Sequence, residues 1–217
     1  MNLSEIKDIR WKRITDYVLE EMPNRVLDVG CSSGNISSFL VNKRVKVFGA
    51  DIVLDNLCKA RDKGINPIMC DLSKGLPYRD QAFDCIVAGE IIEHIIDTDY
   101  FLEEINRVLV SKGVLVITTP NLANLENRLR ILIGRYPIFV DYTSRGDNHV
   151  RVYTGRALKK QLKERGFCII ENIGSFVPFI SYSNLKKINA CLMPALSVIG
   201  SLFPSLAIHT IIKARKR

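Results

Sequence analysis

The sequence predicts an α/β protein with a parallel sheet, and three observations support this fold class. Its 217 residues are 47% apolar, which suits one large core rather than a disordered or fibrous chain. From residue 25 onward, short runs rich in β-branched residues alternate with amphipathic stretches, which is typical of βαβ units. Aspartate or glycine follows several of these runs, as expected where buried strands turn into loops.

Five short apolar runs in the first half of the chain are predicted strands. They cover residues 25–30, 46–51, 67–71, 83–89 and 113–119. A leading helix is expected over 4–21, and amphipathic stretches between the strands predict helices at 33–42, 54–63 and 97–110. The 97–110 helix collects Phe101, Ile105 and Val108 on one face, with Asp97 placed to cap its start and Gly113 beyond its end.

After residue 120 the pattern is less regular. Helices are predicted over 124–133 and 154–165, the second with Thr154 as N-cap and Gly166 at its C-terminal end. Strands are predicted over 167–173 and 207–215. The segment 121–153 is long for a connection in a compact domain, so we expect a substrate loop or lid.

The positive charge of the chain belongs to its second half. Residues 1–110 carry 14 Lys and Arg against 18 Asp and Glu, whereas residues 111–217 carry 17 against 5. This half is either a solvated basic face or the place where an anionic partner or a membrane surface docks.

The C-terminal tail is almost uncharged. Residues 172–212 contain only Lys186 and Lys187 as charged side chains. Three interpretations of the tail remain open: a membrane-spanning helix, an interfacial amphipathic segment, or ordinary burial with a final strand. The prolines and the glycine in the tail favour burial. The N-terminus lacks an apolar leader and the six cysteines form no C-x-x-C pair, so a cytoplasmic location is expected.

A glycine turn follows the first predicted strand in VLDVGCSSG, residues 26–34. Gly30 and Gly34 allow the backbone to turn tightly and to approach a ligand closely. Their spacing differs from the G-x-G-x-x-G pattern of dinucleotide sites. Asp28 at the mouth of this strand would repel a pyrophosphate and favour a ligand that carries an ammonium group, which argues against a nicotinamide-dependent oxidoreductase.

Two further aspartates follow predicted strands. Asp51 ends the second strand at the distance from Gly30 where an acidic side chain accepts hydrogen bonds from ribose hydroxyls. Asp71 ends the third, where a carboxylate can accept from an exocyclic adenine amine. Each alone would also serve as a helix cap or turn residue. Together with Asp28 on one sheet edge, they indicate a nucleoside with an amino-acid tail.

The ordered set of motifs resembles the class I S-adenosylmethionine-dependent methyltransferases, specifically the small type 11 and type 12 forms. The resemblance covers about residues 25–170 and rests on VLDVGCSSGNISSFL, VFGADI, MCDLSKGLPYRDQAFDCIVAGEIIEH, FLEEINRVLVSKGVLVITTPN and, more loosely, NHVRVYTGRALKKQLKERGF. It implies a Rossmann-like, seven-stranded, mostly parallel sheet with an antiparallel last strand and helices on both faces. It also implies an enzyme that uses S-adenosyl-L-methionine.

The resemblance assigns roles to individual residues. It implies that Asp28, Gly30 and Gly34 hold the methionine part of the cofactor, with Cys31 and Ser32 in the same loop. It further implies that Asp51 binds the ribose, that Ile52 packs on the adenine, and that Asp71 with Leu72 binds the adenine edge. Glu90, after the fourth strand, is expected to contact cofactor or substrate. Ser32 stands where this family often has a second glycine.

The resemblance also implies a division of the single domain. It comprises an N-terminal helix (1–24), a cofactor-binding core (25–120), the substrate loop (121–153) and a C-terminal portion (154–217). The stretch PNLANLENRLRILIGRYPI is similar to the MetW family of methionine biosynthesis, whereas EIIEH at 90–94 is closer to the type 11 pattern.

Two histidines are the catalytic candidates. His94 follows the fourth strand at the ligand-binding edge, and His149 lies in the substrate loop, where each could serve as a base or merely order its loop. His209, in the last strand, is expected to be structural. Glu93 lies in the same turn as Glu90, and it is expected either to contact cofactor or substrate as well or to face solvent as the partner of a lysine. Asn121 is expected to hydrogen-bond the substrate. No metal-ligand spacing is present, so no metal is predicted.

The predicted function is methyl transfer to a small-molecule acceptor. Apolar walls with basic rims favour a lipid-linked or anionic acceptor, with peripheral membrane contact through 176–212. One alternative is a cofactor-binding regulatory subunit, similar to MetW, that acts on a partner enzyme through the apolar tail. A contiguous exposed apolar patch would be its mark, and burial of the tail against the sheet would count against it. Another is an RNA methyltransferase, although no RNA-binding signature is present and nucleic acid is not the expected partner.

Overall fold

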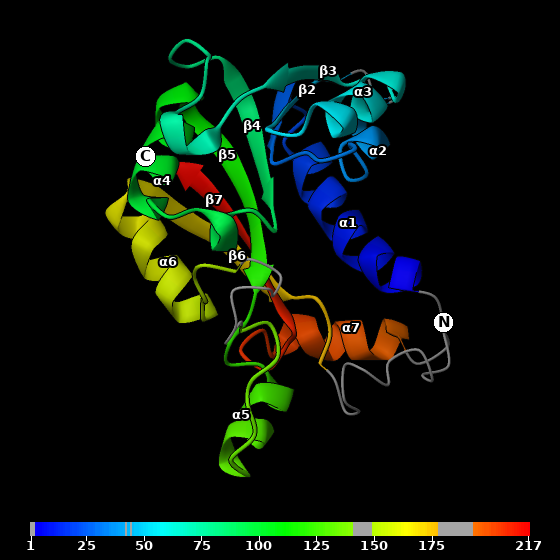
Figure 1. Cartoon of the computed structure of the whole chain (residues 1–217), viewed down its shortest axis with the longest axis vertical. Coiled ribbons are helices and arrows are strands. Elements are labelled where there is room, and N and C mark those ends of the chain that lie inside the picture. The colour runs from blue at the N-terminus through cyan, green and yellow to red at the C-terminus, as the bar shows by residue number, and fades with distance from the viewer. Residues whose placement is uncertain (1–2, 42, 44, 141–148, 178–192) are drawn as a thin grey trace.

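A single mixed sheet organises the computed structural model, which describes residues 3–41, 43, 45–140, 149–177 and 193–217 (Figure 1). Its strands are β1 (Arg25–Val29), β2 (Lys46–Asp51), β3 (Asn66–Met69), β4 (Phe83–Gly89), β5 (Leu109–Pro120), β6 (Phe167–Gly174) and β7 (His209–Lys216). They are hydrogen-bonded in the order β3-β2-β1-β4-β5-β7-β6.

The helices connect these strands. They are α1 (Leu3–Glu20), α2 (Ser38–Val41), α3 (Leu54–Asp62), α4 (Thr98–Val108), α5 (Leu125–Leu132), α6 (Gly155–Glu164) and α7 (Met193–Leu202), with 3₁₀ turns η1 (Leu72–Lys74) and η2 (Ile92–His94). Helix α4 begins at the predicted cap, where the Asp97 carboxylate accepts from the Tyr100 N–H. Thr154 caps α6 in the same way, through the Ala157 N–H.

The direction of each strand agrees with the predicted sheet. Strand β1 is parallel to β2 and β4, β2 is parallel to β3, and β4 is parallel to β5. Strand β7 is antiparallel to both β5 and β6. The prediction of a mostly parallel sheet with an antiparallel last strand is therefore confirmed.

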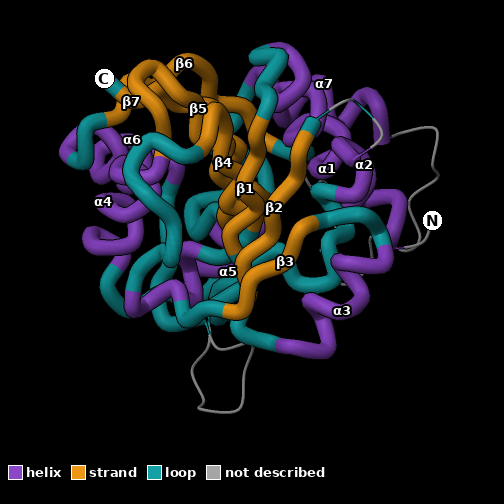
Figure 2. The backbone as a smooth tube through the Cα atoms, turned by 90° about the horizontal axis from the view of Figure 1, so that it is seen from above, coloured by secondary structure: helices purple, strands orange, loops and turns teal. Residues whose placement is uncertain are grey.

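Helices cover both faces of the sheet, as Figure 2 shows. Successive residues of a strand point to opposite faces, so Leu27 of β1 packs in one core cluster and Val26 in the other. The Leu27 cluster includes side chains of α4 and α6, and the Val26 cluster includes side chains of α1, α2 and α3. This double burial explains why the central strands appear as continuous apolar runs.

Three predicted elements differ from the structure. The helix expected over 33–42 is regular only at Ser38–Val41, because the preceding residues form turns in which Ser32 and Gly34 have positive φ. The third strand ends at Met69 instead of residue 71. Strand β5 begins directly after α4, so Gly113 lies inside a strand and not beyond a helix end.

The described parts of the uncharged tail contain the end of β6, the helix α7 and the start of β7. Ala207, Ile208, Ile211 and Ile212 are fully buried. Among the described helices, none combines the length and apolarity needed to cross a bilayer. Part of the segment expected to contact a membrane, residues 178–192, lies outside the described residues, as do residues 141–148 of the expected substrate loop.

The Asp97 cap provides a test of the fold at α4. Replacing it in Asp97→Ala leaves the Tyr100 N–H without its acceptor, and we expect a loss of about 1 kcal/mol in the free energy of unfolding. Asp97→Asn keeps an acceptor oxygen and should retain most of that stability. Urea unfolding of both variants measures the difference, and an equal loss in both would contradict the capping role.

Candidate functional site

The loop after β1 turns in a conformation that glycine favours. Gly30 and Gly34 have φ angles of +72° and +71°, and Ser32 between them has +47°. A Cβ atom on Gly30 would lie 2.7 Å from the Ile91 side chain, so a larger residue would displace that neighbour. The backbone at Gly30 therefore packs directly against Ile91 at the sheet edge.

Asp51 fixes the glycine loop to the end of β2. Its carboxylate oxygens accept from the Ser32 N–H at 2.8 Å and from the Val53 N–H at 2.9 Å. The side chain remains half-buried and keeps acceptor capacity toward the sheet edge.

A cavity of about 200 Å³ opens beside these residues, and we call it the Asp51 cavity. It is lined by Gly30, Asp51, Ile52, Cys70, Asp71, Leu72, Ile91, His94 and Ile95. The structure thus brings together six of the predicted site residues from four segments of the chain. Carboxylates beside aliphatic walls fit a nucleoside, whose hydroxyls and amine need acceptors and whose base needs apolar contact.

The other residues predicted around the glycine loop lie differently. Asp28 is buried beneath the loop, outside the lining of the Asp51 cavity, and accepts a hydrogen bond from Ser37. The Asp28 pKa is raised to about 7, mainly because the carboxyl group is buried. The hydrogen bond from the Ser37 hydroxyl opposes this rise, and the nearby Asp51 charge adds to it. Cys31 is also buried, and burial raises the pKa of its thiol. Ser32 is exposed.

Glu90 joins the N-terminal helix to the sheet edge. Its carboxylate lies 3.0 Å from Arg10 Nη1 of α1, accepts from Thr118 Oγ1 at 2.9 Å, and is 3.5 Å from His209 Nε2. Although burial raises the Glu90 pKa, Arg10, His209 and Thr118 outweigh it and hold the pKa below its usual range. Glu90 does not line the Asp51 cavity.

Of the two alternatives that the sequence left open for Glu93, the solvent-facing position is wrong. Only 2% of it is exposed, because residues 149–152 pack against it and the N–H groups of Val150 and Arg151 donate to its carbonyl. One carboxylate oxygen accepts from Thr119 Oγ1, and the other is buried with no hydrogen-bond partner among the described residues. Burial and the nearby Glu90 raise the Glu93 pKa to about 8.

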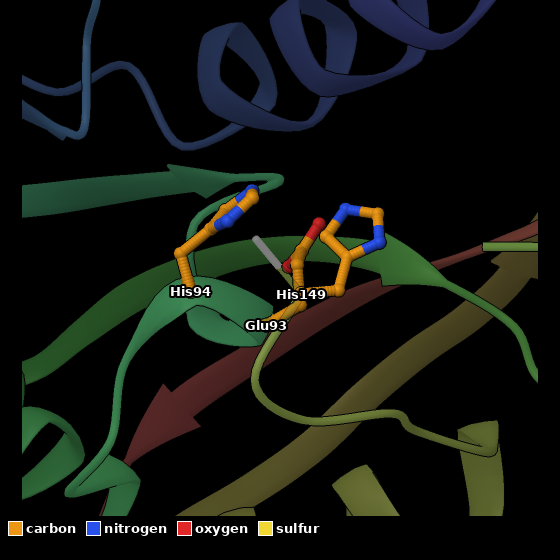
Figure 3. Close-up of side chains that lie close together, drawn as sticks. All are labelled: Glu93, His94 and His149. Carbon is orange, nitrogen blue, oxygen red and sulfur yellow. The ribbon is translucent and has the colours of Figure 1, made fainter. Parts of the chain in front are cut away.

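The two candidate histidines meet at this point. Figure 3 shows His94 and His149 beside Glu93, and the two imidazole ring centroids are 4.9 Å apart. One ligand atom from each of Glu93, His94 and His149 lies within 4.8 Å of the others, an arrangement able to hold a divalent metal ion. The sequence spacing did not reveal this group because His149 is far from the other two along the chain.

A second cavity adjoins the histidine pair, and we call it the His149 cavity. Its walls include Glu93, Thr119, Phe139, His149 and Arg151. It encloses about 10 Å³, room for about one water molecule. Since Val140 and Val152 also line it, both described parts of the expected substrate loop lie at this site.

Two other predicted roles can be compared with the structure. The Asn121 amide was expected to bind substrate, but it donates to the carbonyls of Ser205 and Ala207 and its oxygen accepts from the Ala123 N–H. It therefore orders the chain at the end of β5. His209 is buried in β7 as expected, and burial lowers its pKa to about 4.

The chain has relatives in one protein family. A family profile described as "Methyltransferase domain" matches residues 5–172. The human mitochondrial ubiquinone biosynthesis O-methyltransferase is 32% identical over 151 residues, which cover 61% of this chain and 41% of that protein. The Bos taurus protein named Probable tRNA methyltransferase 9B is 31% identical over 118 residues, which cover 52% of this chain and 25% of that protein. The chain thus spans less than half the length of these relatives.

Solved structures share the fold. A SAM-dependent methyltransferase from Archaeoglobus fulgidus superposes with a TM-score of 0.67 at 19% identity, covering 96% of this chain and 94% of that one. One from Aquifex aeolicus gives a TM-score of 0.58 at 17% identity, covering 93% and 89%.

The buried Glu93 carboxyl predicts a pH-dependent stability. Because its pKa rises from 4.5 to about 8 on folding, the folded state binds this proton more tightly, and stability is lost as pH rises between those values. Glu93→Gln removes the titration and keeps an acceptor oxygen. We compare the free energy of unfolding of Glu93→Gln with that of the unaltered chain. The difference should favour the variant by about 1–3 kcal/mol more at pH 8 than at pH 5. Urea unfolding at both values measures this, and an effect independent of pH would contradict the assignment.

Proposed function

The chain belongs to the methyltransferase-domain family, and from this premise we propose that it transfers a methyl group from S-adenosyl-L-methionine to a hydroxyl group of a small-molecule acceptor. The observation that carries the proposal is the position of His94. This residue lines the Asp51 cavity and lies against His149, which lines the adjoining His149 cavity. His94 therefore lies between the cavity suited to a nucleoside and the smaller His149 cavity.

The residues of the Asp51 cavity suit the cofactor. Asp51 would accept from the ribose hydroxyls, Ile52 and Leu72 would flank the adenine, and Asp71 would accept from the adenine amine. The Asp71 pKa lies below its usual range because the Ser73 hydroxyl and N–H donate to it, so the side chain is an ionised acceptor. The bound cofactor supplies a methyl carbon already activated by a sulfonium, leaving alignment and proton removal to the protein.

The histidines suit a hydroxyl acceptor. A hydroxyl must lose a proton as the new carbon–oxygen bond forms, and an imidazole nitrogen is an effective base near neutral pH. His94 and His149 would share this role, with Glu93 behind them. The name of the ubiquinone O-methyltransferase relative is consistent with transfer to oxygen. Because the His149 cavity holds only about one water molecule, acceptor entry would require residues 138–140 or 150–152 to move.

A catalytically idle regulatory subunit is the second candidate. The observation that favours it is the set of exposed apolar side chains on α5, because such patches are typical of surfaces that bind other proteins. Methyl transfer by the purified chain separates the two functions. Cofactor binding without turnover on any extract fraction would favour the regulatory role.

Cofactor binding is tested first at Asp51. Asp51→Asn removes the charge and keeps one acceptor oxygen, so one of the Ser32 and Val53 N–H groups loses its acceptor. We expect binding of S-adenosylhomocysteine to weaken by about 1–3 kcal/mol, roughly 5- to 150-fold. The exposed Asp55→Asn on the neighbouring helix is the control and should bind normally. Calorimetry with S-adenosylhomocysteine and with NAD measures the effect. Unchanged affinity in Asp51→Asn, or preference for NAD, would refute the site.

Proton removal is tested at the histidines. His94→Ala should lower turnover by about 10²-fold or more, with little change in cofactor affinity, and His149→Ala should lower it to a lesser degree. Release of S-adenosylhomocysteine is followed with lipid extract and with aqueous extract as acceptor sources. Repeating the assay after chelation shows whether the Glu93–His94–His149 group needs a metal ion. Full turnover in both variants would rule out a base at either position.

A further inference from the structure

The second half of α5 and the turn after it expose an unusual run of large apolar side chains. Leu129, Ile131, Leu132, Ile133 and Tyr136 are between 47% and 81% exposed. Single exposed residues of this kind are ordinary on protein surfaces, whereas five within eight positions form a patch that usually meets a partner or a membrane. The patch is separate from the Asp51 cavity, none of whose lining residues it contains.

The C-terminal end of α7 adjoins the start of α5, since Leu202 and Phe203 line the same cavity as Arg128. Val198, Leu202 and Phe203 are between 54% and 69% exposed. The chain after α7 is attached to α5, because the Leu125 N–H donates to the Leu206 carbonyl and Arg128 Nη2 donates to the Ser205 carbonyl. We call these eight exposed side chains the α5–α7 surface.

Cations adjoin this surface around a cavity of about 470 Å³. Arg128, Arg156 and Lys159 line it together with Leu202 and Phe203, and none of the described residues that line it is acidic. Arg128 is held in place by the carbonyls of Ala123 and Ser205. For Arg156 and Lys159, no carboxylate of the described residues lies within ion-pair distance.

The acidic side chain of α5 does not offset this charge. Glu126 is buried and its carboxylate lies 2.9 Å from Arg130, whereas Arg128 and Arg135 are exposed. The α5–α7 surface therefore combines apolar side chains with an unbalanced positive rim. A second copy of the chain would bring cations against cations, and an RNA would require stacking platforms where this surface offers mainly aliphatic side chains.

We propose that the α5–α7 surface docks onto an anionic lipid bilayer. The exposed apolar side chains of α5 and α7 enter the interfacial layer, and Arg128, Arg156 and Lys159 face the lipid phosphates. This combination of apolar insertion and adjacent cations is the arrangement that holds proteins at anionic membrane surfaces. The proposal extends beyond the proposed methyl transfer, since docking is measured without cofactor or acceptor.

Vesicle flotation tests the proposal directly. The full chain is mixed with vesicles of equal parts phosphatidylcholine and phosphatidylglycerol, or of phosphatidylcholine alone. We expect flotation with the anionic vesicles, at least tenfold weaker flotation with the neutral ones, and a loss of binding as salt is raised. Equal binding to both vesicles, or binding to neither, would overturn the proposal.

Two pairs of substitutions separate the apolar and charged contributions. Leu132→Ser with Ile133→Ser, and Arg156→Glu with Lys159→Glu, should each weaken binding to anionic vesicles by at least about tenfold. The matched controls are Met22→Ser, an exposed apolar residue at the end of α1, and Lys160→Glu, an exposed lysine of α6 outside the cavity. Both controls should bind like the unaltered chain, and an equal loss in them would contradict a specific surface.

The same variants also test whether a second copy of the chain, and not a membrane, binds the α5–α7 surface. Thermal unfolding confirms that each variant is folded, since all four test positions except the half-buried Lys159 are exposed. Sedimentation without vesicles measures the oligomeric state. A dimer of the unaltered chain that dissociates in Leu132→Ser with Ile133→Ser would assign the surface to a second copy and overturn membrane docking. A monomer in both cases, with the expected flotation, would support it.

Discussion

Parallel pairing of β1 with β2 and β4 is the constraint on which the rest of the site depends. Parallel strands end at the same edge of a sheet, so the segments that follow them meet there whatever their separation in sequence. Gly30, Asp51 and the turn containing His94 are neighbours for this reason. The left-handed turn at Gly30 is a consequence, because the chain must reverse beneath Ile91 within a few residues.

Acidic side chains gather at this edge, and their surroundings give them different charge states. Glu90 is ionised because Arg10 of α1 lies against it, whereas Glu93 is buried close to the Glu90 charge, so it favours the protonated form near neutral pH. Asp28 is intermediate, with a pKa of about 7. A cationic ligand or metal ion at this edge would therefore shift proton equilibria in the protein as it binds.

The end of β5 separates two kinds of surface. On one side, Thr119 and Pro120 line the His149 cavity near the proposed transfer site. On the other, Asn121 lines the larger basic cavity and is bonded to the chain that leads into β7. The proposed docking surface and the proposed transfer site are therefore adjacent to neighbouring residues at the end of one core strand.

The sequence by itself determined the features that depend on neighbouring residues. Local patterns predicted the strands at 46–51 and 83–89, the caps Asp97 and Thr154, and the aspartate that ends β2, and the structure has these features where they were predicted. Only the tertiary structure decided which side chains are buried and which meet. Glu93 is buried because residues 149–152 cover it, and the Asn121 amide donates to carbonyls of the tail. His149 lies against His94 although α4, β5 and α5 separate them in the sequence. These contacts join distant segments, so their energies depend on packing that no local pattern encodes.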